Sequence, residues 1–273
     1  MTKFIRLVDF EFNRIFKFII GLMIFIFIFQ LASVMFEVFY YKKYIISKGF
    51  NLNEILDSYG AFSFNYISMN IFFFLPLFIA VSLVGLYLFF IWYRDWFGKN
   101  TFIYRLLMLP LPRMNVFFAK LMTLMIAVLS IVLTQFMFLF IYQFIIRVSI
   151  PIEYQSNVLL TDAINGTYLQ FFLPTNPILF FIEYISVICV VMILFTVILL
   201  ERSYHLLGLL IGIGYLLVVS ALIFLPIIVQ FLLFNDLYFY PEEMMIYYVL
   251  LWFILVSWSF IWSKKLLDKK ITV

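Results

Sequence analysis

Residues that could perform catalysis or hold a metal are scarce in this chain of 273 residues. There is one cysteine, Cys189, and one histidine, His205, which excludes an intrachain disulfide and a metal site built from several thiolates or imidazoles. None of the nine glycines lies in the Gly-x-x-x-x-Gly-Lys-Ser/Thr pattern whose backbone amides cradle ATP phosphates. We therefore expect no catalytic residue, no metal ligand and no cofactor bound by this chain.

The composition excludes a water-soluble globular protein. Hydrophobic residues make up 67% of the chain, charged residues only 12%, and the mean hydropathy is +1.15. Soluble domains have about a quarter charged residues, so this chain has too few polar side chains to cover a surface in water. We expect an all-α integral membrane protein surrounded by lipid. No nucleic-acid partner is expected, because the formal net charge of +4 is not gathered on a soluble domain.

Uncharged runs long enough to cross a hydrocarbon core of about 30 Å indicate the membrane-spanning helices. Two such runs are trimmed, because residues 58–70 are rich in Ser, Asn and Tyr and because Pro174 and Pro177 interrupt a later stretch. The sequence then predicts a transmembrane domain over 18–263, followed by a basic tail over 264–273. Its six helices are expected at residues 18–39, 71–92, 121–146, 178–200, 206–234 and 244–262. The sequence does not indicate a role for the outer loops 40–70 and 147–176.

Lysine and arginine positions indicate the topology. With the N-terminus inside, fourteen of the 18 Lys and Arg residues lie on the inner side, as expected for cytoplasmic segments. Both termini are therefore expected in the cytoplasm, in a multi-pass protein of a cell membrane of bacterial type. Residues 1–17 alternate basic and apolar side chains at helical spacing, which predicts an amphipathic elbow helix along the inner membrane surface. The alternative is a straight continuation of the first span.

The inner loop over 93–120 is the most informative segment. Gly98 allows a sharp turn and Thr101 can cap a helix, so a short helix is expected over 102–109, ended by Pro110 and Pro112. Its aromatic and aliphatic side chains need an apolar partner surface, which could be the lipid interface or a cytoplasmic protein.

The same loop carries a spaced series of residues: an acid, Gly, Thr, a Leu pair, Pro and Arg, then Lys where the next helix starts. They are Asp95, Gly98, Thr101, Leu106, Leu107, Pro110, Arg113 and Lys120. This series resembles the loop between helices two and three of type-2 ATP-binding-cassette (ABC) exporter permeases, which also have an elbow helix and six spans with both ends inside. Asp95 departs from the Glu more usual there, and Pro112 from the Ser. Many members also have re-entrant helices between spans five and six, where this chain has only residues 235–243.

The resemblance implies that residues 94–113 form a coupling helix on a separate ABC ATPase subunit, which binds ATP and Mg²⁺. A second permease copy or a related permease would complete the transporter. The coupling residues are expected to be Asp95, Gly98, Thr101, Phe102, Tyr104, Leu107, Pro110 and Arg113, with Phe102 and Tyr104 most important. The chain itself would not be an enzyme, since ATP hydrolysis would occur in the other subunit.

Polar residues within the spans are candidates because burying them in lipid is costly. They are Glu183, Gln135, Gln143 and Gln230. They could line a translocation path; we favour the alternative that they join helices, with Glu183 paired to a neighbour such as Arg147. Gly208 and Gly212 form a small-residue face that could pack within the chain or in a homodimer.

We therefore predict the permease subunit of an ABC exporter. A Phe-rich path is consistent with a peptide, an antibiotic or a lipid-like substrate, but the sequence leaves the substrate and the direction open. The alternative is a secondary transporter or channel without an ATPase partner, which a co-purifying soluble ATPase would exclude. An intramembrane protease with a Glu-Glu-x-x-x-Arg motif is excluded, because Glu242 and Glu243 are followed by Tyr247 at the Arg position.

Overall fold

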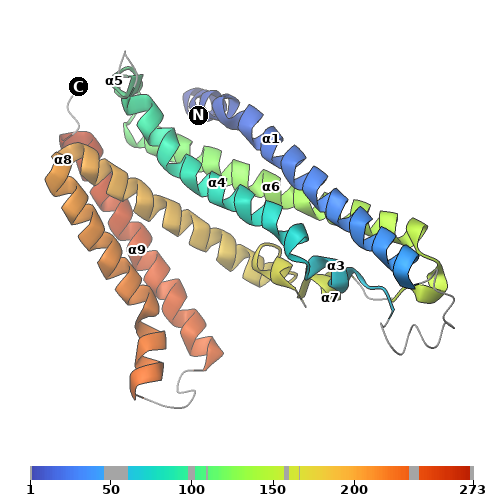
Figure 1. Cartoon of the computed structure of the whole chain (residues 1–273). Helices are drawn as coiled ribbons and strands as arrows, with labels where there is room; N and C mark the ends of the chain where they lie inside the picture. Colours follow the sequence, from blue (N-terminus) through green and yellow to red (C-terminus); the bar gives the residue numbers. More distant parts are fainter. Residues whose placement is uncertain are drawn as a thin grey trace. The chain divides into compact units, whose positions relative to one another are not determined.

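The computed structural model describes residues 2–45, 61–97, 102–108, 110–156, 160–165, 167–233 and 240–270. These residues are mainly helical, and strand pairing among them is limited to an isolated bridge between Phe62 and Gln155. Five helices are long and apolar enough to cross a membrane. They are α1 (Thr2–Tyr40), α4 (Ile71–Trp96), α6 (Met114–Ser149), α8 (Pro177–Leu233) and α9 (Pro241–Lys269), shown in Figure 1. The expected all-α class with several long apolar helices is observed.

Helix α8 accounts for the difference between these five helices and the six spans expected. It has 57 residues, which would extend roughly 85 Å, far more than one crossing of the hydrocarbon core needs. His205 interrupts it with φ 51° and ψ −125°, so two helical arms meet there. The chain doubles back at this point (Figure 1), and the two arms contain most of the residues expected as the separate spans 178–200 and 206–234.

Helix α1 is continuous through the residues for which the sequence predicts an elbow and a first span. Its 39 residues extend roughly 58 Å, about twice the hydrocarbon core. No non-helical residue separates 1–17 from 18–39 in the part that the structure describes. Any elbow is therefore not set off by a backbone turn, and the extra length can extend beyond the core as helix.

The chain divides into two compact units. Unit 2 comprises Phe10–Leu86 and Leu124–Ile182, and aromatic side chains join its long helices. The Tyr142 ring lies 6.1 Å from that of Phe27 and 5.8 Å from that of Phe73, joining α6 to α1 and α4. Buried aromatic pairs at these distances stabilise a bundle beyond the apolar area that they remove from water or lipid.

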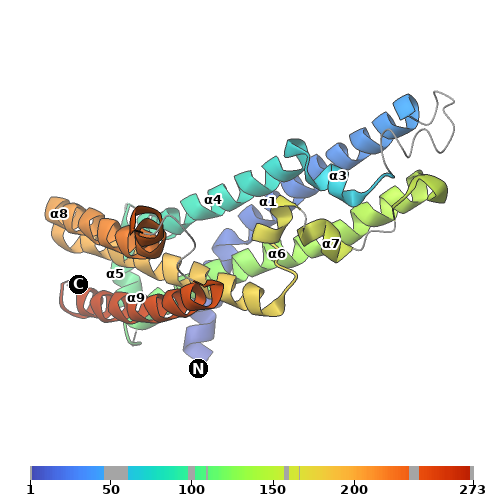
Figure 2. The ribbon, with the colours of Figure 1, turned by 90° about the horizontal axis from the view of Figure 1, so that it is seen from below.

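Unit 2 also contains several short elements that contact one another. They are α3 (Phe64–Ser68), η3 (Ile152–Tyr154), α7 (Leu160–Asn165) and η4 (Tyr168–Phe171). Helix α3 contacts α7 and α7 contacts η4, an arrangement visible for α3 and α7 in Figure 2. The Phe62 amide donates to the Tyr154 carbonyl at 2.8 Å, and the Ser156 amide donates to the Phe62 carbonyl at 3.0 Å. The two expected outer loops are thus hydrogen-bonded to each other.

Unit 1 comprises Met1–Asp9, Tyr87–Thr123 and Glu183–Val273. It contains α5 (Phe102–Leu107), and the second arm of α8 packs against α9. The core of that contact is formed by Val219, Leu251 and Leu255 with Ile193 from the first arm. Near α5, the rings of Trp92, Phe117 and Phe195 lie 5.4 to 6.4 Å apart and join α4, α6 and α8.

Candidate functional site: the loop end of unit 1

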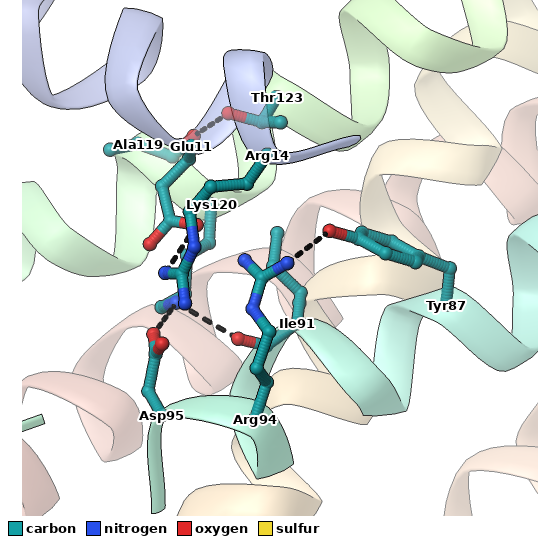
Figure 3. A network of polar contacts seen from close by, with 9 residues as sticks. All are labelled: Glu11, Arg14, Tyr87, Ile91, Arg94, Asp95, Ala119, Lys120 and Thr123. Atoms are coloured by element: carbon teal, nitrogen blue, oxygen red, sulfur yellow. Dashed lines mark hydrogen bonds and ion pairs between the residues drawn. The ribbon is translucent and has the colours of Figure 1, made fainter. Parts of the chain in front are cut away.

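A fully buried ion pair lies where α4 ends and α6 begins. Lys120 Nζ pairs with Asp95 Oδ2 and also donates to the Ile91 carbonyl at 2.9 Å (Figure 3). The ammonium lies 5.3 Å from the Trp92 ring centroid. Neither charged side chain is exposed, so each depends on the other to offset its loss of hydration. The pair therefore fixes the start of the predicted coupling loop to both helices that flank it.

Arg113 fixes the other end of the loop. Its Nη1 donates to the Leu267 carbonyl at 2.6 Å, in the last part of α9. Carbonyls in the last turn of a helix have no N–H donor within the helix, and they bind a cationic donor favourably. The loop is thus tied to α4 and α6 at one end and to α9 at the other.

Between these attachments, α5 presents two different faces. Ile103, Leu106 and Leu107 are buried, at the spacing of a single helical face. Arg105 and Met108 point away from that face, and Met108 is 69% exposed. The helix therefore packs on its own unit by one side and offers the other side to a partner.

The coupling residues expected from the sequence divide between these two faces. Phe102 and Tyr104 are half-buried, and the Tyr104 ring lies 6.3 Å from that of Trp96. Leu107 is buried within the chain and Pro110 is exposed. Gly98 and Thr101 lie outside the described residues. The exposed residues Phe97, Arg105 and Met108 were not among the predicted coupling residues, because the sequence does not fix the rotation of α5 about its axis.

A second polar cluster lies at the end of the first arm of α8. The Tyr93 hydroxyl donates to the Glu201 carboxylate. The Arg202 guanidinium carbon lies 4.6 Å from the ring centroids of both Tyr93 and Phe97 and 5.9 Å from that of Trp96. This cluster was not predicted from the sequence. A signal was present, because the acid–base pair 201–202 follows one span and the aromatic residues end another.

The polar residues expected in the spans are not gathered in one place. Gln135 and Gln143 belong to unit 2, whereas Glu183 and Gln230 belong to unit 1. Glu183 is half-buried in the first arm of α8. Ion pairing between Glu183 and Arg147 stays a prediction.

Gln135 belongs to a buried chain of hydrogen bonds within unit 2. Its Nε2 donates to Gln30 Oε1 at 3.1 Å, and Gln30 Nε2 donates to the Phe73 carbonyl at 3.2 Å. Pro76 lies three residues after Phe73; it has no amide hydrogen, and its ring disturbs the preceding turn of α4. The carbonyl that Pro76 deprives of its usual donor is that of Phe72, so Gln30 donates to the next carbonyl in the turn that the proline disturbs.

Pro226 has a corresponding arrangement in unit 1. Proline deprives the carbonyl four residues earlier of its usual donor, and here that carbonyl belongs to Leu222. The Tyr247 hydroxyl of α9 donates to it at 2.7 Å. The Tyr248 hydroxyl donates to the next carbonyl, that of Ile223, at 3.3 Å. These hydroxyls join α9 to the second arm of α8.

Gly208 and Gly212 lie against the first arm of α8. A Cβ atom on Gly208 would lie 2.0 Å from the Leu200 carbonyl oxygen, which is backbone and has little room to move. A Cβ on Gly212 would lie 2.9 Å from Val197 Cγ1. Glycine is thus required at 208 by the close return of the chain after His205, while the homodimer contact considered from the sequence stays a prediction.

No protein-family model, curated protein or solved structure matches this chain. Across the described ranges, no group of three or more His, Cys, Asp or Glu residues could hold a metal ion. The candidate site therefore rests on the geometry of the loop end alone.

Proposed function

We propose that this chain is the permease subunit of an ABC exporter and that α5 is its coupling helix on a separate ATPase subunit. The observation that carries the proposal is a short helix held at both ends, by Lys120 and Asp95 and by Arg113, with one face left exposed. A helix that receives force needs rigid attachment to the spans that move and a free face for its partner. ATP and Mg²⁺ belong to the ATPase subunit.

The proposal includes six spans with both termini in the cytoplasm. The length of α8 and its turn at His205 support two crossings by that element. The excess of Lys and Arg in 1–17, in 93–120 and in 264–273 supports an inner location for these segments. Helix α1 is longer than one crossing needs, so its N-terminal part extends past the core on the inner side, and an elbow along the membrane surface would require a bend between 1–17 and 18–39.

Coupling then follows from the attachments of the loop. Movement of α5 is transmitted to α4 and α6 through the ion pair of Asp95 and Lys120, and to α9 through Arg113. Because packed helices move as rigid bodies, closure of an ATPase dimer would shift these spans together. A second permease copy or a related permease would form the other half of the path, and we propose a peptide, an antibiotic or a lipid-like molecule as substrate.

The exposed face of α5 gives a direct test. A photo-crosslinking amino acid at Met108 should capture an ATPase with a phosphate-binding loop, identified by mass spectrometry of the crosslinked band. The same amino acid at Ile152, which is 83% exposed and lies in an expected outer loop, is the matched control and should capture no ATPase. The double variant Arg105→Glu with Met108→Ser should abolish transport-linked ATP hydrolysis while membrane insertion is retained, because central contacts dominate interface energy.

The opposite outcome is equally clear. If position 108 captures no ATPase and the double variant transports normally, the coupling assignment is wrong. A secondary transporter or channel would then be the better description.

A further inference from the structure

Several polar atoms near the end of α4 are buried without a hydrogen bond among the described residues, and three of them concern the Arg202 cluster. These three are Arg202 Nε, Trp96 Nε1 and Ser203 Oγ. Buried polar groups in folded proteins nearly always have a partner, so a cluster without one requires an explanation. Two of the three are obligate donors and the hydroxyl can donate as well, so the missing partner is an acceptor.

Two of these groups lie together, and the third belongs to the residue next to one of them. The Arg202 guanidinium carbon lies 5.9 Å from the Trp96 ring centroid, and Ser203 follows Arg202 in the chain. The rings of Tyr93 and Phe97, each 4.6 Å away, hold the guanidinium in place. The side chain of Arg202 is 20% exposed, so part of it reaches the surface of the unit.

Glu201 forms an ion pair with Arg202, and Tyr93 also engages the guanidinium, but these contacts take up only part of its N–H groups. Glu201 accepts the Tyr93 hydroxyl, and its other oxygen lies 3.7 Å from Arg202 Nη2, which is beyond hydrogen-bond distance. A guanidinium carries five N–H groups in a planar fork that matches two oxygens of a phosphate. An anion with several acceptor oxygens is therefore the chemistry that suits this site.

The surroundings of the site indicate where that anion comes from. Phe97 is 73% exposed, and Leu206 and Leu207, just past the turn, are 82% and 67% exposed. The second arm of α8 continues from them with exposed leucine and isoleucine side chains that need lipid around them. The donors thus lie where an apolar, lipid-covered surface ends, which is the level of phospholipid headgroups, and aromatic residues are typical of this level.

We propose that Arg202, Trp96 and Ser203 bind the phosphodiester of an anionic phospholipid, whose acyl chains contact Phe97, Leu206 and Leu207. Arg202 binds the phosphate oxygens, while the Trp96 indole and the Ser203 hydroxyl donate to the same headgroup. Anionic lipids are concentrated in the cytoplasmic leaflet. The excess of basic residues in the expected inner segments favours a cytoplasmic location for this site. The site requires neither an ATPase nor a transported substrate, so this proposal is independent of the proposed function.

Native mass spectrometry of the purified full chain, with phosphatidylglycerol and phosphatidylcholine added in equal amounts, tests the site. The wild-type chain should retain phosphatidylglycerol, and Arg202→Gln should reduce its retention roughly tenfold, as expected for lost charge-assisted hydrogen bonds. Trp96→Phe keeps an aromatic ring and removes the N–H, and Ser203→Ala removes the hydroxyl. Each should weaken retention by a smaller factor, which keeps the test decisive if the Arg202 variant fails to fold.

The matched control is Arg147→Gln, which removes an exposed basic residue from the last turn of α6 in unit 2 and should leave retention unchanged. Equal retention of both lipids, or no effect of Trp96→Phe and Ser203→Ala, would overturn the proposal. Displacement of phosphatidylglycerol by millimolar inorganic phosphate would identify a site for a soluble anion. Unchanged lipid retention with loss of a bound ATPase would identify a protein contact.

Discussion

Pro76 in unit 2 and Pro226 in unit 1 interrupt helices in the same way, and in each case another helix donates a hydrogen bond to a carbonyl in the turn before the proline. In unit 2 the donor is the amide of Gln30, which is fully buried and also accepts from Gln135. In unit 1 the donor to the Leu222 carbonyl is the half-buried hydroxyl of Tyr247. The hydrogen bonds near Pro76 form a linked chain of buried side-chain amides. The hydrogen bond near Pro226 comes from a single hydroxyl, whose aromatic ring would stay packed without it.

Unit 1 adds a third kind of connection between helices, the ion pair of Lys120 and Asp95. The three kinds differ in what remains after one partner is removed. A broken ion pair leaves a buried charge, a broken amide chain leaves buried neutral groups, and a lost hydroxyl leaves one carbonyl. This difference predicts the order of the effects below.

The largest effect is expected for Lys120→Met. It leaves the Asp95 carboxylate buried without its ammonium partner, at a loss of about 3–5 kcal/mol in the free energy of unfolding. The measurement is unfolding of the purified chain by dodecyl sulfate in mixed micelles. The double variant Lys120→Met with Asp95→Leu removes both charges and should recover most of the loss. A double variant as unstable as the single one would show that the pair does not act as a unit.

An intermediate effect is expected for Gln30→Leu. This change leaves the Phe73 carbonyl and the Gln135 amide without their partner, and the free energy of unfolding should fall by about 1–3 kcal/mol. Gln143→Leu in α6 is the control; Gln143 is half-buried, and the change should be close to neutral. Equal losses in the two variants would remove the special role assigned to the amide chain.

The smallest effect is expected for Tyr247→Phe, which keeps the ring and removes only the donor to Leu222. A loss of about 0.5–1.5 kcal/mol is expected in the same unfolding measurement. Pro226→Ala restores the backbone donor to the Leu222 carbonyl, so Tyr247→Phe should cost less in that background. An unchanged penalty would mean that the tyrosine does not compensate for the proline.

Features with a local cause were the most predictable from the sequence. A helix was expected over 102–109 because Pro110 limits it, and α5 is observed over Phe102–Leu107. Hydropathy located the long helices because each apolar run must be about as long as the hydrocarbon core is thick. The interruption near His205 also fell between two predicted spans, although a single histidine is too weak a signal to predict a positive φ.

Contacts of the candidate site depend on how distant segments pack, and hydropathy does not specify that packing. Arg113 finds the carbonyl of Leu267, 154 residues away, because α9 ends beside it. The inward direction of Leu107 depends on the rotation of α5 about its axis, which a run of apolar residues on nearly every side leaves open. The buried pairing of Asp95 with Lys120 likewise required the register of α4 against α6, which composition does not fix.

The division of the chain into two units has a consequence for biosynthesis. Unit 2 has its last residue at position 182, whereas unit 1 draws on both ends of the chain and needs α9. At about 5–20 residues per second, the residues from 183 to 273 take roughly 5–18 s to synthesise. During that interval unit 2 has all of its residues, while Arg113 still lacks the carbonyl that it will bind. The contact of Arg113 with α9 therefore forms late, and α5 is not held at both ends until α9 has been synthesised.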